Sequence, residues 1–257
     1  NARGKSDAYA TTYGGSGGII AGASASAGTN VTNTVSAYLA GNDDEAAQIS
    51  ADEDISVTAS SDVIFNAHGD STVYGFVGSN GARTGNLVVS TTQAYLGQDA
   101  DILAGNDILV DATNRVEKPF IGANLSAGSG GFWGGPAGDS ATIITNMAEA
   151  YAADNSRIEA GNDLTLSAAN DVSAYDKAIL SSGGAIAVAD VHSTIINTNT
   201  AQTSIGENTQ ILAGNDVNLH SQAKANVEAV TYTEGFGLGA SADGKATVNL
   251  TADNDTS

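Results

Sequence analysis

The sequence contains no cysteine, two prolines, one methionine and one tryptophan among its 257 residues. Without cysteine, the chain can form neither a disulfide framework nor a thiolate metal site. Nine Lys and Arg residues oppose 29 Asp and Glu residues, which gives a formal net charge of −20. This balance excludes a nucleic-acid binder, because neutralising phosphates requires clustered cations. No run of eighteen apolar residues is present, so we expect no membrane insertion.

Large apolar side chains are also scarce, and Gly, Ala, Ser, Thr, Asn and Asp dominate the composition. A compact core of large side chains is difficult to build from these residues. Disorder is nevertheless a poor interpretation, because 41% of the residues are hydrophobic and Val, Ile and Leu recur regularly. Collagen is excluded because the 31 glycines follow no strict period of three and proline is nearly absent.

One phrase recurs along the chain. Its last three copies read Ile-x-Ala-Gly-Asn-Asp followed by alternating aliphatic residues, and a degenerate copy precedes them. The copies occupy residues 49–57, 102–110, 158–166 and 211–219, so their spacings are 53, 56 and 53 residues. An Ala-Tyr pair precedes three copies, at Ala37-Tyr38, Ala94-Tyr95 and Ala150-Tyr151. Four copies at nearly constant spacing indicate a repeat array. We therefore interpret residues 1–257 as one continuous segment of a longer array.

Within each repeat, apolar residues alternate with small or polar ones, and a period of two predicts β-strands. The segment 147–153 has some helical character, but it lies between strands and is also predicted as a strand. Each phrase reads as strand, Gly-Asn-Asp turn and strand, because Gly and Asn tolerate positive φ and Asp accepts backbone hydrogen bonds. The predicted turn residues are Asn106, Asp107, Asn162, Asp163, Asn215 and Asp216.

Two repeat architectures accept a unit of this length: a propeller blade and a β-solenoid. Propellers usually carry an aromatic signature in every blade, whereas small inward residues suit stacked coils. We therefore predict an all-β parallel β-solenoid with two or three coils per repeat, each coil containing about 20 residues. The Gly-rich segment 128–139 is interpreted as an insertion into this pattern.

The phrase Ile-x-Ala-Gly-Asn-Asp-Leu-x-Leu-x-Ala at residues 158–168 resembles the repeat of filamentous haemagglutinin-type adhesins. The Gly/Ala-rich tracts and the Ala-Tyr pairs resemble the giant leukotoxin-like filamentous adhesins of Gram-negative bacteria. The resemblance covers nearly the whole chain, in four repeats and a fraction. It implies a right-handed parallel β-helix that is exported to the cell surface and built as a long fibre. The irregular first repeat and segment 128–139 depart from this pattern.

Calcium is the metal that the acidic turns suggest, because repeats-in-toxin modules bind Ca²⁺ through a Gly- and Asp-containing phrase. That phrase recurs every nine residues, whereas the phrase of this chain recurs only every 53 to 56 residues. Hydrogen-bonding turns are therefore favoured over metal sites, and no cofactor is predicted. The candidate ligands, should Ca²⁺ bind, are Asp43, Asp44 and Asp54.

An enzyme is not favoured either, although some β-helices cleave acidic polysaccharides. Such a site requires three or more acidic groups and a base in one groove. In the sequence, the basic residues appear scattered, and the three histidines occupy non-equivalent places in the repeats. The most unusual segment contains Phe132 and Trp133 between glycines. It is either a contact loop for glycans or neighbouring fibres, or a segment that folds back over a face of the solenoid.

The sequence therefore predicts a non-catalytic structural and adhesive segment of a large extracellular bacterial fibre. Its expected partners are neighbouring repeats, other copies in lateral or end-to-end contact, and glycans of a host or partner cell. The alternative is a calcium-stiffened module of a secreted toxin that binds carbohydrate or a surface. Melting with Ca²⁺ and with a chelator distinguishes the two.

Overall fold

The computed structural model describes residues 1–39 and 47–257. Across these ranges the structure is all-β, with thirteen strands, and every strand pairing is parallel. The described residues contain no helix long and apolar enough to cross a membrane. The parallel pairing of consecutive repeats is consistent with the β-solenoid that the sequence predicts.

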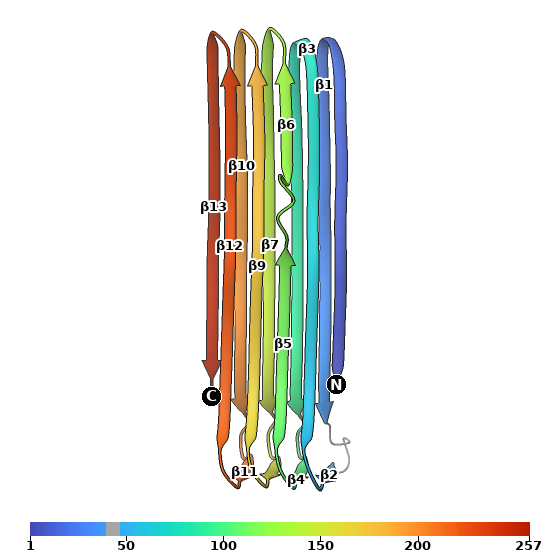
Figure 1. The fold of residues 1–257 in the computed structure, drawn as a ribbon, viewed down its shortest axis with the longest axis vertical. Helices are drawn as coiled ribbons and strands as arrows, with labels where there is room; N and C mark the ends of the chain where they lie inside the picture. The colour runs from blue at the N-terminus through green and yellow to red at the C-terminus, as the bar shows by residue number, and fades with distance from the viewer. Residues whose placement is uncertain (40–46) are drawn as a thin grey trace.

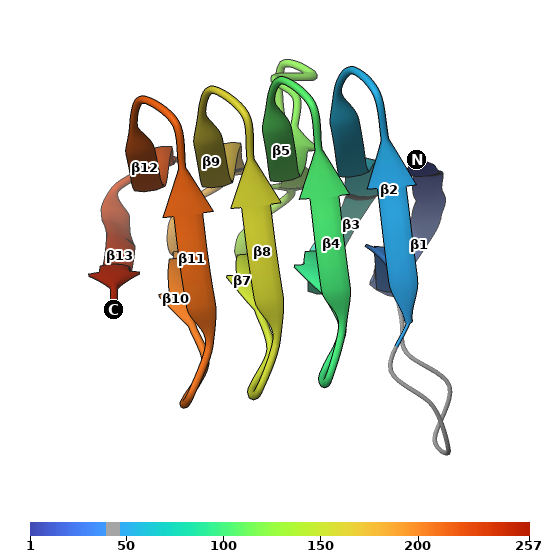
Figure 2. The ribbon, with the colours of Figure 1, turned by 90° about the horizontal axis from the view of Figure 1, so that it is seen from below.

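Each coil has two long legs and one short side. The second coil shows the path: β3 (Ile55–Leu96) ascends as one leg, turns at Gly75 and descends as the other. β4 (Asp101–Ala104) then crosses the base and leads to the next ascending leg. The long legs form a nine-stranded sheet that continues over the turn, and the short strands form a separate four-stranded sheet in the order β11-β8-β4-β2 (Figures 1 and 2).

The other coils follow the same path. The first contains β1 (Ala2–Leu39) and β2 (Gln48–Ala51). The third contains β5 (Ile108–Lys118), β6 (Leu125–Gly130), β7 (Trp133–Ala152) and β8 (Arg157–Ala160). The fourth contains β9 (Leu164–Gly183), β10 (Ile186–Ile205) and β11 (Gln210–Ala213), and the fifth contains β12 (Val217–Phe236) and β13 (Gly239–Thr256). Segment 147–153 lies almost entirely in β7, which confirms the strand prediction.

One sequence repeat forms one coil. Ile55 pairs with Ile108, Ile108 with Leu164, and Leu164 with Val217, so adjacent coils differ by one repeat length at each step. The prediction of two or three coils per repeat is therefore wrong. A leg of about 20 residues spans roughly 66 Å as an extended strand. Coils of about 20 residues would require the chain to turn within each leg. The alternating pattern within a leg contains no residue that forces such a turn, so the strand continues.

The interpretation of residues 128–139 as an insertion is also wrong. These residues form the end of β6, the turn and the start of β7, in register with the coils on both sides. The additional residues lie instead at 119–124, between β5 and β6. β5 pairs with β3 at an offset of 53 residues, whereas β6 pairs with β3 at an offset of 56. Pro119, the first residue after β5, has no N–H to donate to the ladder, which suits an interruption at this point.

Inward side chains, most of them Ala, Val, Ile or Leu, fill the space between the two legs in three apolar clusters. The largest cluster lies toward the base and includes Ile102, Ile108 and Leu164, all at most 1% exposed. A second cluster surrounds Phe65, and a third, which includes Leu125 and Leu180, lies nearer the turn. A compact core of large residues is unnecessary, because each coil covers the inward side chains of the next.

Buried polar side chains separate the apolar clusters. Between the first two clusters, the Asn114 amide donates to Ser90 O at 3.1 Å and to Met147 O at 3.0 Å. Farther along the legs, Lys118 and Asp176 are both fully buried, with Nζ and Oδ1 2.5 Å apart. Tyr175 O also accepts from Lys118, and Ser193 Oγ donates to the second oxygen of Asp176. Burial lowers the pKa of Lys118, and the Asp176 carboxylate opposes this shift.

Candidate functional site

The Gly-Asn-Asp phrases form the corner between each short strand and the next ascending leg. Asp107 Oδ1 accepts hydrogen bonds from the Asn162 side chain at 2.8 Å and from the Asp163 backbone N–H at 3.1 Å. The same pair of bonds joins Asp54 to Asn106 and Asp107, and Asp163 to Asn215 and Asp216. The predicted turn residues therefore lie at turns, but they connect successive coils instead of capping only local backbone groups.

Glycine is required at these corners because the backbones of successive coils nearly touch there. A Cβ atom on Gly161 would lie 2.1 Å from Gly105 O, and one on Gly214 would lie 2.1 Å from Gly161 O. At the other corner of the base, Asp99, Asn155 and Asn208 adopt φ between 56° and 58°. Asn and Asp tolerate this left-handed conformation better than most residues do.

The acidic corners use carboxylate oxygens to accept hydrogen bonds from the protein. Asp54, a candidate calcium ligand, accepts from Asn106 and Asp107 through the same oxygen, Oδ1. Within residues 1–39 and 47–257, no group of three or more His, Cys, Asp or Glu side chains could hold a metal ion. The other two candidate ligands, Asp43 and Asp44, lie outside the described residues.

Basic residues that appear scattered in the sequence lie in rows across the coils. On the ascending face, the register aligns Lys5, Asp62, Arg115, Asp171 and Lys224, so the charge alternates in sign from coil to coil. On the short side, Arg157 forms an ion pair with Asp101 at 3.1 Å. Its hydrogen bond to Asp101, together with the nearby Glu159 carboxylate, raises the pKa of the Arg157 guanidinium.

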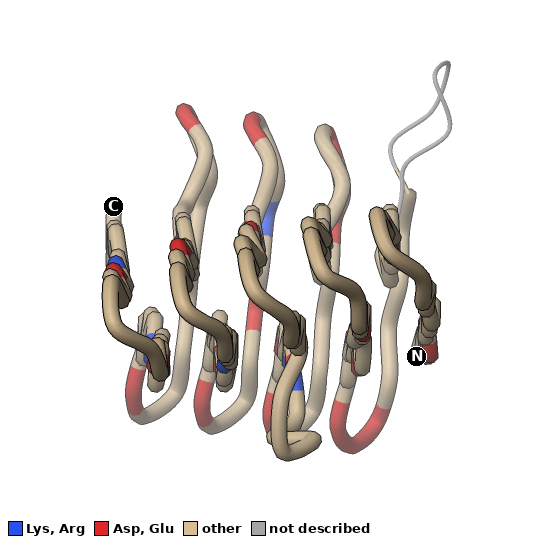
Figure 3. Tube along the Cα trace, turned by 90° about the horizontal axis from the view of Figure 1, so that it is seen from above, with Lys and Arg blue, Asp and Glu red and all other residues tan. Residues whose placement is uncertain are grey.

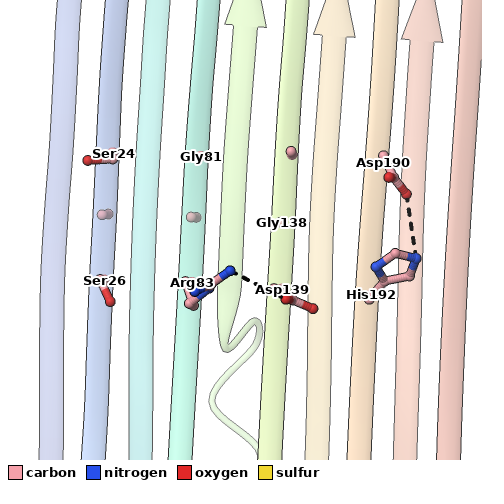
Figure 4. Close-up of a pocket in the computed structure, with 11 residues that line it drawn as sticks. Ser24, Ser26, Gly81, Arg83, Gly138, Asp139, Asp190 and His192 are labelled. Atoms are coloured by element: carbon pink, nitrogen blue, oxygen red, sulfur yellow. Dashed lines mark ion pairs between the residues drawn. The ribbon is translucent and has the colours of Figure 1, made fainter.

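A third row borders a shallow groove on the descending face (Figure 4). It aligns Ser26, Arg83, Asp139, His192 and Lys245. The floor is made of small residues from adjacent coils, and the hollow has a volume of about 440 Å³. Arg83 partly neutralises Asp139, which lies 3.7 Å away, and His192 lies 3.8 Å from Asp190.

The groove contains the two carboxylates of Asp139 and Asp190. A site for polysaccharide cleavage of the kind considered above needs at least three acidic groups. The side chains of Arg83, Asp139, Asp190 and His192 are between 46% and 72% exposed, so water screens their electrostatic interactions. The groove can offer hydrogen bonds and charge to an extended polar ligand lying across the coils. It does not enclose a ligand in a water-excluding cavity.

Phe132 and Trp133 lie at the turn that joins the two legs of the third coil. They are 50% and 52% exposed, so they do not fold back to cover a face of the solenoid. Phe132 stacks on Phe76 of the preceding coil, with ring centroids 5.0 Å apart and an angle of 7° between the ring planes. We call the five equivalent turns the apolar rim, formed by residues 17–20, 74–77, 130–133, 183–186 and 236–239.

A second aromatic stack follows the Ala-Tyr pairs. Tyr95 stacks on Tyr38 at 5.0 Å and on Tyr151 at 4.8 Å, so the rings form a ladder across three coils. Burial, followed by the charges of Tyr95 and Glu149, raises the pKa of Tyr151. These spacings match the separation between paired strands, and the rings therefore contribute to coil stacking.

The sequence patterns considered above did not predict the charge rows or the rim, because they relate residues that are close together in the chain. Each row becomes visible only when residues 53 to 57 positions apart are compared, which is the spacing that the phrase already displays. No protein-family model, curated protein or solved structure matches this chain.

Proposed function

We propose that this chain is a structural and adhesive segment of a large extracellular fibre on a bacterial cell surface, without catalytic activity. The observation that carries the proposal is the parallel pairing of every coil with the next, from the first coil to the fifth. Backbone ladders of this kind join one coil to the next and resist bending. The resemblance of the phrase to filamentous adhesin repeats supports the cellular location.

The fifth coil exposes apolar side chains whose counterparts in the fourth coil are buried. Val217 and Val248 are 45% and 41% exposed, whereas Leu164 and Ile195, their counterparts in the fourth coil, are fully buried. A further coil, contributed by the same chain or by another copy, would cover these side chains. Covering apolar surface contributes about 25 cal/mol per Å².

We propose that the coils form a right-handed β-helix. In Figure 1 the ascending legs lie nearer the viewer than the descending legs, while the chain advances from right to left. Figure 2 supports the same order of the two faces from below. A path that rises in front, passes over the top and descends behind while moving left has the right-handed sense.

The cross-section gives the proposed fibre the shape of a blade. Each coil adds about 4.8 Å to the length and uses about 53 residues, whereas the legs make the blade roughly 66 Å wide. Outward loops and the shallow groove in Figure 4 would present polar groups to glycans of a partner surface. The net charge of −20 would discourage nonspecific collapse of such fibres.

Two experiments test this proposal. Negative-stain imaging of the native full-length particle should show a long flat fibre, and a compact particle would contradict the structural role. Antibodies against the purified segment should label intact bacterial cells that express the protein. Labelling only after the cells are opened would contradict the surface location.

A further inference from the structure

The cross-section of the solenoid is strongly asymmetric in charge. The twenty residues of the apolar rim contain no Asp, Glu, Lys or Arg, and the only polar groups in their side chains are the Tyr74 hydroxyl and the Trp133 N–H. Figure 3 shows the rim turns nearest the viewer in tan, with acidic segments recurring at the corners of the opposite end. The described acidic residues at that end are Asp52, Glu53, Asp54, Asp99, Asp101, Asp107, Asp154, Glu159, Asp163, Glu207 and Asp216.

Exposed apolar side chains concentrate on the same rim. Of the 26 large hydrophobic residues that are exposed in the described structure, ten lie within these twenty residues. They are Ile19, Ile20, Tyr74, Phe76, Val77, Phe132, Trp133, Ile186, Phe236 and Leu238, and their exposed fractions range from 36% to 99%. Side chains of this size expose on the order of 1,000 Å² in total. A stable protein interface buries about 800 Å² on each partner.

We propose that the apolar rim is the surface through which two copies of this chain pair, rim against rim. The proposal does not depend on the cellular location or adhesive role inferred above. Every coil contributes one turn to the rim, at the same place in the coil. When two antiparallel copies are related by a twofold axis, the row of turns on one copy therefore faces the same row on the other. Larger stacks would provide longer rows.

The charge distribution permits this pairing despite the charge of −20 on each copy. When two rims meet, the acidic corners lie at the outer ends of the pair, each about 66 Å from the contact. That distance is many times the Debye length of about 8 Å at physiological ionic strength. Within six residues of the rim segments, the chain carries five acidic residues against three basic ones, so only −2 of the net charge lies near the contact; they are Asp70, Asp139, Asp190, Glu234 and Asp243 against Arg83, Lys177 and Lys245.

A glycan fits the rim less well than a second copy does. One face of Phe76 and one face of Phe132 are stacked on each other, which leaves less ring surface for a sugar. The rim also lacks the convergent polar side chains that orient a small ligand. A lipid surface fits less well too, because the rim carries no Lys or Arg to attract phosphate headgroups.

Sedimentation velocity and Trp133 fluorescence test the pairing directly, because Trp133 is the only tryptophan of the chain. The wild-type protein should sediment with twice its monomer mass of 25.6 kDa as its concentration rises into the micromolar range. Over the same range, the Trp133 emission maximum should shift to shorter wavelength. Phe132→Glu, which places a charge on the rim, should weaken the pairing at least tenfold.

A matched variant controls for the added charge. Ile143 is 41% exposed on the descending face, away from the rim, and Ile143→Glu should pair as the wild-type protein does. Circular dichroism would establish that both variants are folded. Phe132→Cys should also form a disulfide-linked dimer on oxidation, whereas Asn162→Cys at the acidic end should remain monomeric.

Three outcomes would overturn the proposal. They are a wild-type protein that stays monomeric at 100 µM, a Phe132→Glu variant that pairs normally, and equal oxidation of the two cysteine variants. Flotation of the monomer with phosphatidylcholine vesicles would reassign the rim to a lipid surface. A change in Trp133 emission when an oligosaccharide is added to the monomer would reassign it to glycan binding.

Discussion

The glycines at the Gly-Asn-Asp corners set the closest approach between successive coils, and replacing Gly161 with alanine tests this directly. Gly161 belongs to the third coil, so its corner lies between those of the second and fourth coils. The new Cβ atom would lie 2.1 Å from Gly105 O and 2.7 Å from Gly105 C. Ordinary contact begins near 3.4 Å, so the two backbones would have to separate by about 1.3 Å.

That separation would break the hydrogen bonds that close the corner. Gly161 N–H donates to Ala104 O at 3.0 Å, and Asn162 N–H donates to Asn106 O at 3.0 Å. Asp107 Oδ1 also accepts from Asn162 and Asp163 at this corner. Losing two or three such bonds, at about 1 kcal/mol each, predicts that Gly161→Ala lowers the free energy of unfolding by about 2–3 kcal/mol.

Urea unfolding followed by circular dichroism would measure this change. Gly85→Ala is the matched control, because a Cβ atom on Gly85 would meet nothing within 4 Å. This control should leave stability unchanged or raise it by about 0.4–1 kcal/mol through the unfolded state. A Gly161→Ala variant as stable as the wild-type protein would refute the close approach of the coils. Equal destabilisation by Gly85→Ala would show that the effect is not specific to the corner.

Five further predictions concern the contacts that join the coils. Asp107→Ala should lower the free energy of unfolding by about 1–2 kcal/mol, whereas Asp107→Asn, which keeps the accepting oxygen, should cost less. For the wild-type protein, adding Ca²⁺ or a chelator should leave the melting midpoint unchanged, and a rise with Ca²⁺ that Asp107→Asn abolishes would contradict the hydrogen-bonding role of the corners. Asp176→Ala should cost about 3–5 kcal/mol because it leaves the Lys118 ammonium buried without its partner, and replacing both with Met and Leu should recover much of the loss. Burial lowers the pKa of Lys118 in the folded chain below its ordinary value of 10.5. Between the lowered pKa of the folded chain and the ordinary pKa of the unfolded chain, the unfolded chain binds more protons than the folded chain. The contribution of Lys118 to the free energy of unfolding should therefore rise with pH over this window, and that rise should be absent in Lys118→Met. Tyr95→Ala, which removes the central ring of the tyrosine ladder, should cost about 1–3 kcal/mol in urea unfolding, more than Tyr13→Ala, whose ring makes only an edge contact with His68.

Local patterns were sufficient to predict the strands, the Gly-Asn-Asp corners and the repeat. The period of two in segments such as 164–168 predicts alternate inward and outward side chains, and in β9 buried residues alternate with residues that are partly buried or exposed. The corner prediction succeeds for a similar reason, since Gly, Asn and Asp have conformational preferences that act within a few residues. The assignment of these polar side chains to neighbouring coils depends on contacts 53 to 56 residues away, which local patterns do not contain.

The length of the coil was predicted wrongly because strands of about 20 residues exceed the usual length of about five or six. The Gly-rich tracts also resemble turns, yet Gly128, Gly130 and Gly134 lie within β6 and β7. Glycine fits there because it has no side chain to accommodate; a Cβ atom on Gly134 would lie 2.7 Å from Ser129 Oγ. The position of the three additional residues at 119–124 likewise follows only from the change of register between β5 and β6.

The central claim, that one repeat forms one coil, is tested most directly by disulfide trapping in this cysteine-free chain. Thr145 and Thr198 are exposed register partners in β7 and β10, and Thr251 of β13 is the next residue in the same row. Paired parallel strands lie about 4.8 Å apart, within the Cα separation of 4.4–6.8 Å that a disulfide spans. Oxidation of Thr145→Cys/Thr198→Cys should therefore give an intramolecular disulfide, whereas Thr145→Cys/Thr251→Cys, about 9.6 Å apart, should give none. A maleimide control would establish that both thiols of the first pair are reactive. If this pair then forms no disulfide, the account is contradicted, because coils of about 20 residues would place the two positions two or three coils apart.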